Sequence, residues 1–197
     1  MKNYAALDLP VNIKQDSFDP KTIQLQPNMR WSYAIVDPAV CLTKESIDFF
    51  TDLVGGNIMC QLHKGLPGDV MPIHVDGRVQ PDGSIRCPRE WAVNITWGST
   101  SSEMFWYDLT EEAKISRPPS SNNNTNLFPG YSPGWKDSDV VEIDRCVLSG
   151  PTLINLNIPH HVKNYDTINT RWALTIRADV SVLSYSQAYQ LFAPYYK

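Results

Sequence analysis

The sequence lacks a long apolar run, and its first residues, MKNYAALDLPVN, lack the apolar core of a signal peptide. It also lacks a basic block: 17 Lys and Arg residues are spread along the chain against 21 Asp and Glu residues, for a net charge of −4. An acidic chain of this kind has no bulk attraction for phosphate, so we expect no nucleic-acid partner. We likewise expect no membrane association.

Cysteine is scarce, and no two cysteines form a CxxC pair. The four residues, Cys41, Cys60, Cys87 and Cys146, are too scattered for a zinc site of the usual spacing. The same scatter suits reduced thiols, which persist in the cytosol. We therefore expect a cytoplasmic protein, and no pattern in the sequence specifies its oligomeric state.

The composition is that of a globular protein, with 42% hydrophobic and 19% charged residues. A chain of 197 residues fits one domain, and we predict a single domain over residues 1–197 without internal repeats. Within it we expect an N-terminal flanking segment and helix over 1–56, a β core over 57–183, and a C-terminal helix and tail over 184–197.

Short alternating segments dominate the middle of the chain and predict strands. In Trp91–Trp97 the residues Trp91, Val93, Ile95 and Trp97 share one face, and Asn94 lies on the other. Further strands are predicted over 31–36, 57–63, 69–76, 104–109, 139–147, 152–160, 171–177 and 180–183. Two helices are predicted, over 185–192 and over 43–54, where Thr43 caps the start and Gly55-Gly56 ends the helix.

The stretch from Thr152 to Arg177 predicts a hairpin with functional side chains. Ile154, Leu156 and Ile158 share one face, and continued alternation places His160 on that face. A polar turn follows, and a second strand beginning at Arg171 returns that residue to the neighbourhood of His160. Inward-facing His and Arg side chains need an anionic or metallic partner. The alternative is a histidine satisfied within the core and an arginine at the rim.

A second histidine motif lies upstream. His74-x-Asp76 presents an imidazole and a carboxylate from one face of one strand, so both can bind one ion. Two histidines and one carboxylate, with further positions open, form the facial triad of non-haem Fe(II) oxygenases.

In the order HxD…H…R, the sequence resembles the 2-oxoglutarate/Fe(II)-dependent dioxygenases. The matching motifs are His74-x-Asp76, Pro159-His160-x-Val162 and Arg171-x-x-Leu174. The context Arg89-Glu-Trp-Ala-Val-Asn-Ile95, followed by Phe105-Trp-Tyr107, is most similar to the aspartyl/asparaginyl β-hydroxylase-like branch, including phage and marine bacterial versions. The resemblance covers residues 57–180.

The resemblance implies a mainly β fold, a double-stranded β-helix (jelly roll, cupin-like) with a few flanking helices. The order of the motifs agrees, because ligands on an early and a late strand meet only if the sheet folds back on itself. The resemblance also implies that His74, Asp76 and His160 hold Fe(II), and that Arg171 pairs with the far carboxylate of 2-oxoglutarate. Asn94, if it points into the barrel, would bind 2-oxoglutarate or a metal-bound water. The alternative for Asn94 is a structural hydrogen bond to a neighbouring strand.

The implied function is an Fe(II)- and 2-oxoglutarate-dependent dioxygenase. Such an enzyme couples decarboxylation of 2-oxoglutarate, to succinate and CO₂, with hydroxylation of a C–H bond in a peptide side chain or a small molecule. Two other classes fit the same residues: a non-catalytic cupin-like metal-binding module and a Zn or Mn hydrolase with an HxD…H site. Turnover of 2-oxoglutarate with iron separates the oxygenase from both.

Three choices between neighbouring residues depend on strand geometry. His160 is preferred to His161 as the ligand because its parity matches the apolar face. Arg171 is preferred to Arg177 because six residues of strand span about 20 Å, and only the residue near His160 would reach a metal-bound acid. His63 has no carboxylate close in sequence, so we assign it to the surface or core rather than to the metal.

Two segments around the predicted site are loops. Arg86 and Arg89 flank the loop after the HxD motif, where each would meet an anionic substrate or solvent. Residues 117–137 are rich in Pro, Ser, Asn and Gly, and we predict that they form a lid over the metal.

Overall fold

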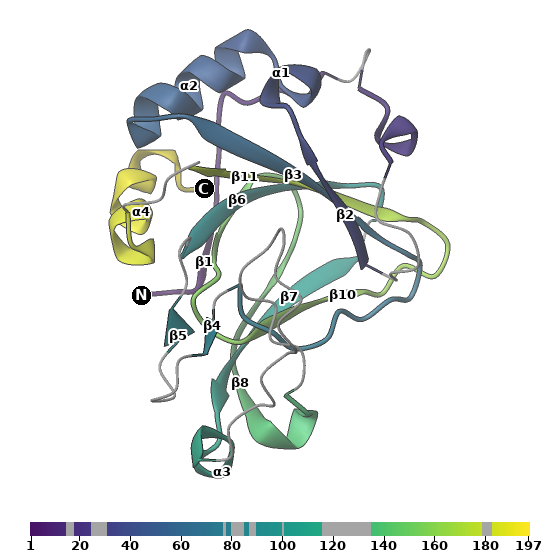
Figure 1. Cartoon of the computed structure of the whole chain (residues 1–197), viewed down its shortest axis with the longest axis vertical. Coiled ribbons are helices and arrows are strands. Elements are labelled where there is room, and N and C mark those ends of the chain that lie inside the picture. Colours follow the sequence, from purple (N-terminus) through teal and green to yellow (C-terminus); the bar gives the residue numbers. More distant parts are fainter. Residues whose placement is uncertain are drawn as a thin grey trace.

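Two antiparallel sheets face each other in the computed structural model (Figure 1), which describes residues 1–14, 18–24, 31–76, 78–79, 85–86, 90–99, 101–115, 135–178 and 183–197. The larger sheet has the order β1-β9-β6-β11-β3-β2 and the smaller has the order β10-β7-β8. The strands of the larger sheet are β1 (Tyr4–Ala6), β9 (Thr152–Asn155), β6 (Trp91–Trp97), β11 (Arg171–Ala178), β3 (Ile58–Gly65) and β2 (Trp31–Val36). Those of the smaller are β10 (His160–Asn164), β7 (Ser102–Leu109) and β8 (Val140–Val147), while β4 (Arg78–Val79) pairs with β5 (Ile85–Arg86).

The outer face of the larger sheet carries two helices that follow β2, the C-terminal helix and the main core. Figure 1 shows α1 (Pro38–Cys41) and α2 (Lys44–Val54) on the side of this sheet that faces away from the smaller one. Trp91 of β6 packs edge-on against Phe192, just after α4 (Tyr185–Leu191), with ring centroids 5.7 Å apart. Phe50 of α2 is buried in the same cluster. The alternation in β6 therefore predicts the core face correctly.

The caps of α2 are those predicted. The Thr43 hydroxyl accepts the backbone N–H of Ser46 at 3.3 Å, and Gly55 ends the helix in the left-handed conformation with φ of 70°. Within the described residues the structure also has elements that the sequence did not predict: the short helices α1 and α3 (Glu111–Ile115) and 3₁₀ turns at Pro20–Thr22, Asp137–Asp139 and Ala193–Tyr195.

The predicted strand over 152–160 is confirmed only as far as Asn155 and is wrong beyond it, because the chain changes sheets there. β9 ends at Asn155, whose side-chain Oδ1 accepts the backbone N–H of Asn157 at 3.0 Å. Pro159 has no N–H to donate to a ladder. β10 then begins at His160 and pairs with β7 in the smaller sheet. This crossing folds the sheet back on itself, and the fold is a double-stranded β-helix, or jelly roll.

The predicted strand over 69–76 is an extended segment rather than a regular strand. It pairs with β10 through isolated bridges, Val70 to Lys163 and His74 to His160. The predicted strands over 31–36, 57–63, 91–97, 104–109, 139–147 and 171–177 are confirmed as β2, β3, β6, β7, β8 and β11, with ends shifted by up to two residues.

Several predictions fall outside the described residues. Residues 117–134 of the predicted lid over 117–137 are not among the described residues. The same holds for residues 180–182 of the predicted strand over 180–183. Arg89 is outside them as well, whereas Arg86 lies in β5.

Among the helices that the structure describes, none is both long enough and apolar enough to span a bilayer.

Candidate metal centre

The two histidines of the predicted triad lie side by side on adjacent extended segments. The backbone N–H of His74 donates to the carbonyl of His160 at 2.9 Å, and the N–H of His160 donates to the carbonyl of His74 at 2.8 Å. Residues that exchange both bonds are directly opposite in an antiparallel pair, so their side chains share one face. The two rings are 4.5 Å apart between centroids, and both residues are 3% exposed.

Asp76 completes the cluster from two residues further along the first segment. Its Oδ1 lies 3.6 Å from Nε2 of His74. One ligand atom from each of His74, Asp76 and His160 lies within 4.8 Å of the other two, so the three can hold one metal ion. The structure therefore brings together the three residues that the HxD…H pattern selects.

Backbone carbonyls determine which nitrogen of each imidazole faces the cluster. Nδ1 of His74 is 2.8 Å from the carbonyl of Pro72, and Nδ1 of His160 is 2.8 Å from the carbonyl of Ile158. A carbonyl oxygen only accepts, so each Nδ1 donates to its carbonyl, and Nε2 is the ring nitrogen that faces the cluster and would bind a metal ion. Metal-binding histidines in proteins are oriented by hydrogen bonds of this kind.

The charge state of the cluster also suits a metal. Burial and the neighbouring His74 lower the pKa of His160 to about 3, so this imidazole is neutral at physiological pH. Burial would raise the pKa of Asp76, but the Arg177 guanidinium and the adjacent histidines hold that pKa well below its usual range. Two imidazole nitrogens and one carboxylate oxygen form a donor set that fits Fe(II).

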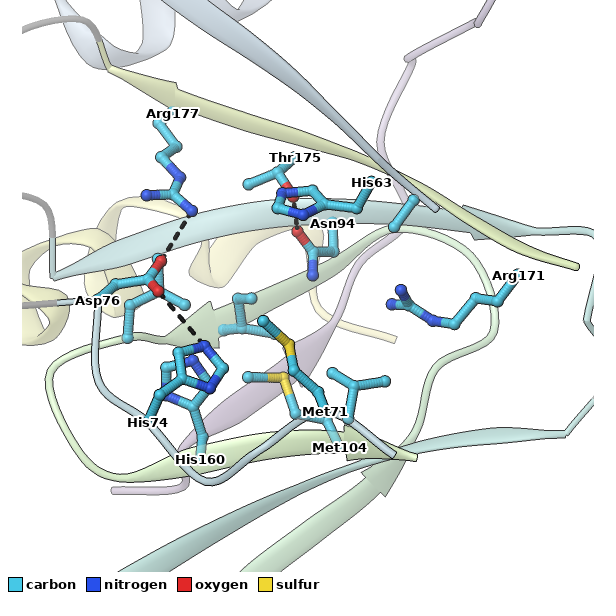
Figure 2. Close-up of a pocket in the computed structure, with 14 residues that line it drawn as sticks. His63, Met71, His74, Asp76, Asn94, Met104, His160, Arg171, Thr175 and Arg177 are labelled. Carbon is cyan, nitrogen blue, oxygen red and sulfur yellow. Dashed lines mark hydrogen bonds and ion pairs between the residues drawn. The ribbon is translucent and has the colours of Figure 1, made fainter. Parts of the chain in front are cut away.

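Arg177 orients the carboxylate, a role that the sequence reading missed. Its Nη2 donates to Oδ2 of Asp76 at 2.8 Å, which leaves Oδ1 turned toward His74 (Figure 2). The expectation that Arg171, and not Arg177, is the arginine on the side of the metal ligands is therefore wrong. β10 runs on to Asn164 before the turn, so β11 starts far from His160 and returns toward the triad at Arg177.

Removing this ion pair should weaken metal binding. We expect Arg177→Met to lower the affinity for Co(II) or Fe(II) by about tenfold to 100-fold, because partners that orient a metal ligand typically contribute that much. Titration calorimetry of the metal-free protein measures the change. Arg145→Met, at an exposed arginine of β8, is the matched control. Equal affinity in Arg177→Met and Arg145→Met would show that the contact with Asp76 does not organise the site.

Arg171 occupies the same pocket at the end away from the triad. The pocket lies between the two sheets and is lined by His74, Asp76 and His160 as well as by Arg171 (Figure 2). Arg171 is 2% exposed, and burial lowers the pKa of its guanidinium to about 10. It therefore remains charged at neutral pH. A buried cation facing a cavity is well suited to pair with a carboxylate that enters it.

Asn94 combines the two roles that the sequence left open. Its Oδ1 accepts the hydroxyl of Thr175 on the adjacent strand β11 at 2.7 Å, which is a structural hydrogen bond. The residue also lines the pocket, and Figure 2 shows its amide nitrogen directed into the space. The Nδ2 group is thus placed to donate to a bound molecule.

Five further lining residues were not predicted as part of the site. His63, Thr175 and Arg177 come from β3 and β11, and Met71 and Met104 supply apolar surface opposite them. Sequence parity could have found Thr175 and Arg177, because they share the face of Arg171 along β11. His63, assigned from the sequence to the surface or core, instead lines the pocket.

His161 lies on the opposite face of β10 from the triad. Its ring packs against Phe105 and Tyr107 of β7, with centroids 4.9 and 5.5 Å away. The preference for His160 over His161 thus agrees with the placement of both side chains.

Comparisons with known proteins give structural likeness without sequence likeness. No protein-family model matches the chain, and no curated protein sequence matches it. Three solved structures illustrate the likeness. An oxalate decarboxylase from Lactobacillus farciminis, in a formate complex, is 10% identical with a TM-score of 0.40, covering 83% of this chain and 33% of that one. The chain thus spans about a third of the length of that decarboxylase.

Two oxygenases are similar over most of both chains. An oxidoreductase of the 2OG-Fe(II) oxygenase family from Burkholderia pseudomallei is 13% identical with a TM-score of 0.42, covering 85% of this chain and 77% of that one. A prolyl-4-hydroxylase from Pseudomonas putida is 14% identical with a TM-score of 0.39, covering 79% and 77% of the two chains.

Proposed function

We propose that the protein is an Fe(II)- and 2-oxoglutarate-dependent oxygenase. The observation that carries this proposal is the content of one pocket: three metal-ligand groups at one end and the buried, charged Arg171 at the other. A 2-oxo acid with a second carboxylate would use both ends of the pocket: its 2-oxo acid group would chelate the metal, and its second carboxylate would pair with the cation. The HxD…H…R order of the sequence, with its resemblance to the aspartyl/asparaginyl β-hydroxylase-like branch, supports the same assignment.

His74, Asp76 and His160 would hold the metal. When bound, Fe(II) supplies the oxidative chemistry that amino-acid side chains lack, namely activation of O₂ for hydroxylation of a C–H bond. Three protein ligands leave coordination positions open for small molecules. Arg177 keeps Asp76 turned toward the ion and adds a positive charge that keeps the carboxylate ionised.

The remaining pocket residues bind and orient the co-substrate. Arg171 pairs with the far carboxylate through its fork of N–H donors. Asn94, held by Thr175, donates from its amide nitrogen. Met71 and Met104 line the opposite wall and exclude water from the methylene groups of the acid.

The prime substrate in this proposal is a peptide side chain or a small molecule, and hydroxylation of a C–H bond is the reaction. The enzyme works in the cytoplasm, where its cysteines stay reduced, and needs no nucleic acid or membrane.

The reaction is testable without knowing the prime substrate. Purified protein with Fe(II), ascorbate and O₂ should convert 2-oxoglutarate to succinate and CO₂, because oxygenases of this type decarboxylate the co-substrate slowly on their own. Zn(II) should bind at the same residues without turnover, since it has no redox chemistry. Iron-loaded protein that forms no succinate would favour a metal-binding module, and hydrolytic activity with Zn or Mn would favour a hydrolase.

Arg171 should control affinity for the co-substrate alone. We expect Arg171→Met to weaken 2-oxoglutarate binding by about 100-fold, because one charge-assisted pair is lost. Metal affinity should be unchanged, because Arg171 lies at the other end of the pocket from the triad. Anaerobic titration of the Fe(II) protein with 2-oxoglutarate measures the first quantity and calorimetry with Co(II) the second. Unchanged affinity for 2-oxoglutarate in Arg171→Met would show that Arg171 does not bind the co-substrate.

A further inference from the structure

His63 faces the pocket from the second half of β3. In the sheet register it lies opposite Ala173 of β11 on one side and Tyr33 of β2 on the other. Its ring is 6.3 Å from that of Tyr33 between centroids. Figure 2 shows the imidazole on the pocket wall, with Asp76 toward one side of the view and Arg171 toward the other.

The strand register places His63 beside the path between the triad and Arg171. Ala173 is the small residue between Arg171 and Thr175 on the inner face of β11, and all three line the pocket. Because residues diagonal across a strand pair are within reach of long side chains, His63 neighbours both Arg171 and Thr175. A molecule that extends from the metal ligands to Arg171 passes over the methyl group of Ala173 and alongside His63.

The chemistry of His63 suits a hydrogen-bond donor to an anion. Burial, with the positive charges of Arg177 and Arg171, lowers the pKa of His63 to about 3. The neutral ring has one N–H donor and one acceptor nitrogen. It therefore supplies a donor next to Arg171 without adding a third positive charge to the pocket.

We propose that His63 is a co-substrate-recognition residue whose ring N–H donates to the same carboxylate that Arg171 pairs with. The far carboxylate of the 2-oxo acid is thus held by two side chains from adjacent strands, one charged and one neutral. This inference rests on the proposed function. It adds to the co-substrate site a residue, His63, that is outside the HxD…H…R pattern. The pairing also gives selectivity for dicarboxylates, because a 2-oxo acid without the second carboxylate leaves both groups without their anionic partner.

The test compares two acids on the iron-loaded protein under anaerobic conditions, followed by visible absorption. 2-Oxoglutarate has the far carboxylate, and 2-oxopentanoate has a methyl group there. In His63→Leu, binding of 2-oxoglutarate should weaken by about 10-fold to 100-fold, while binding of 2-oxopentanoate changes by less than about twofold. His63→Gln retains an N–H donor and should recover most of the affinity for 2-oxoglutarate. His161→Leu removes another partly buried histidine, from the opposite face of β10, and should leave both affinities unchanged.

The outcomes separate the inference from the function on which it rests. Equal weakening for both acids in His63→Leu, or unchanged affinity for 2-oxoglutarate, overturns the role of His63 and leaves the oxygenase intact. A wild type that binds iron but neither acid overturns the proposed function, and the role of His63 with it. Should His63→Leu fail to fold in thermal melts, His63→Ala removes the same donor without adding bulk. The same comparison of acids then applies.

Discussion

Replacing His160 with alanine should abolish Fe(II) binding, whereas His161→Ala should keep it. His160 is buried in the cluster, its Nδ1 is held by the carbonyl of Ile158, and its Nε2 is left to bind the ion. His161 packs on the rings of Phe105 and Tyr107 on the other side of the sheet. Calorimetric titration with Co(II) and anaerobic titration with Fe(II) measure the difference.

The histidine pair serves as its own control, because both variants remove an imidazole from the same strand. His161→Ala should lower the free energy of unfolding by about 1 kcal/mol through lost ring contacts, without altering metal affinity. Thermal melts in the absence of metal measure that cost. If His161→Ala loses the metal and His160→Ala retains it, the pairing of β10 with the HxD segment is displaced by one residue.

Asp76→Ala should reduce iron-dependent succinate formation to background. The substitution removes one of the three proposed ligands and the anion that pairs with Arg177, so a buried guanidinium is left beside two imidazoles. A positive site of this kind repels a divalent cation. The readout is succinate formed per protein at saturating Fe(II) and 2-oxoglutarate, with bound iron measured in parallel.

Asp108→Ala is the matched control, because Asp108 is an exposed carboxylate on β7. It should retain the wild-type rate. Full activity in Asp76→Ala would show that the carboxylate is not a ligand and that a different donor completes the metal site.

The sequence predicted the residues of the triad and the jelly-roll fold, but it did not predict the course of the chain around His160. The inward placement of His160 is right, but the reason given for it is wrong. The alternation predicts one continuous strand from Ile154 through Pro159, whereas the chain leaves the larger sheet after Asn155. His160 faces inward because it exchanges backbone hydrogen bonds with His74. A proline and a side chain bonded to the backbone are local signals of such a break.

The error over Arg177 has the same origin. The preference for Arg171 requires β11 to start next to His160. β10 continues for four residues beyond His160, so the turn that follows lies away from the metal ligands. β11 then runs back toward them and brings Arg177 to Asp76. His63 was missed for another reason: it neighbours Arg171 only through the pairing of β3 with β11, which no local pattern specifies.

Anaerobic titration of the protein with Fe(II) and then 2-oxoglutarate, followed by visible absorption, tests the central claim most directly. Bidentate binding of a 2-oxo acid to protein-bound Fe(II) produces a charge-transfer band. We predict a band that saturates at one 2-oxoglutarate per iron, is absent in His160→Ala, and needs far more 2-oxoglutarate in Arg171→Met. Protein that holds one Fe(II) and develops no band at millimolar 2-oxoglutarate would contradict the assignment.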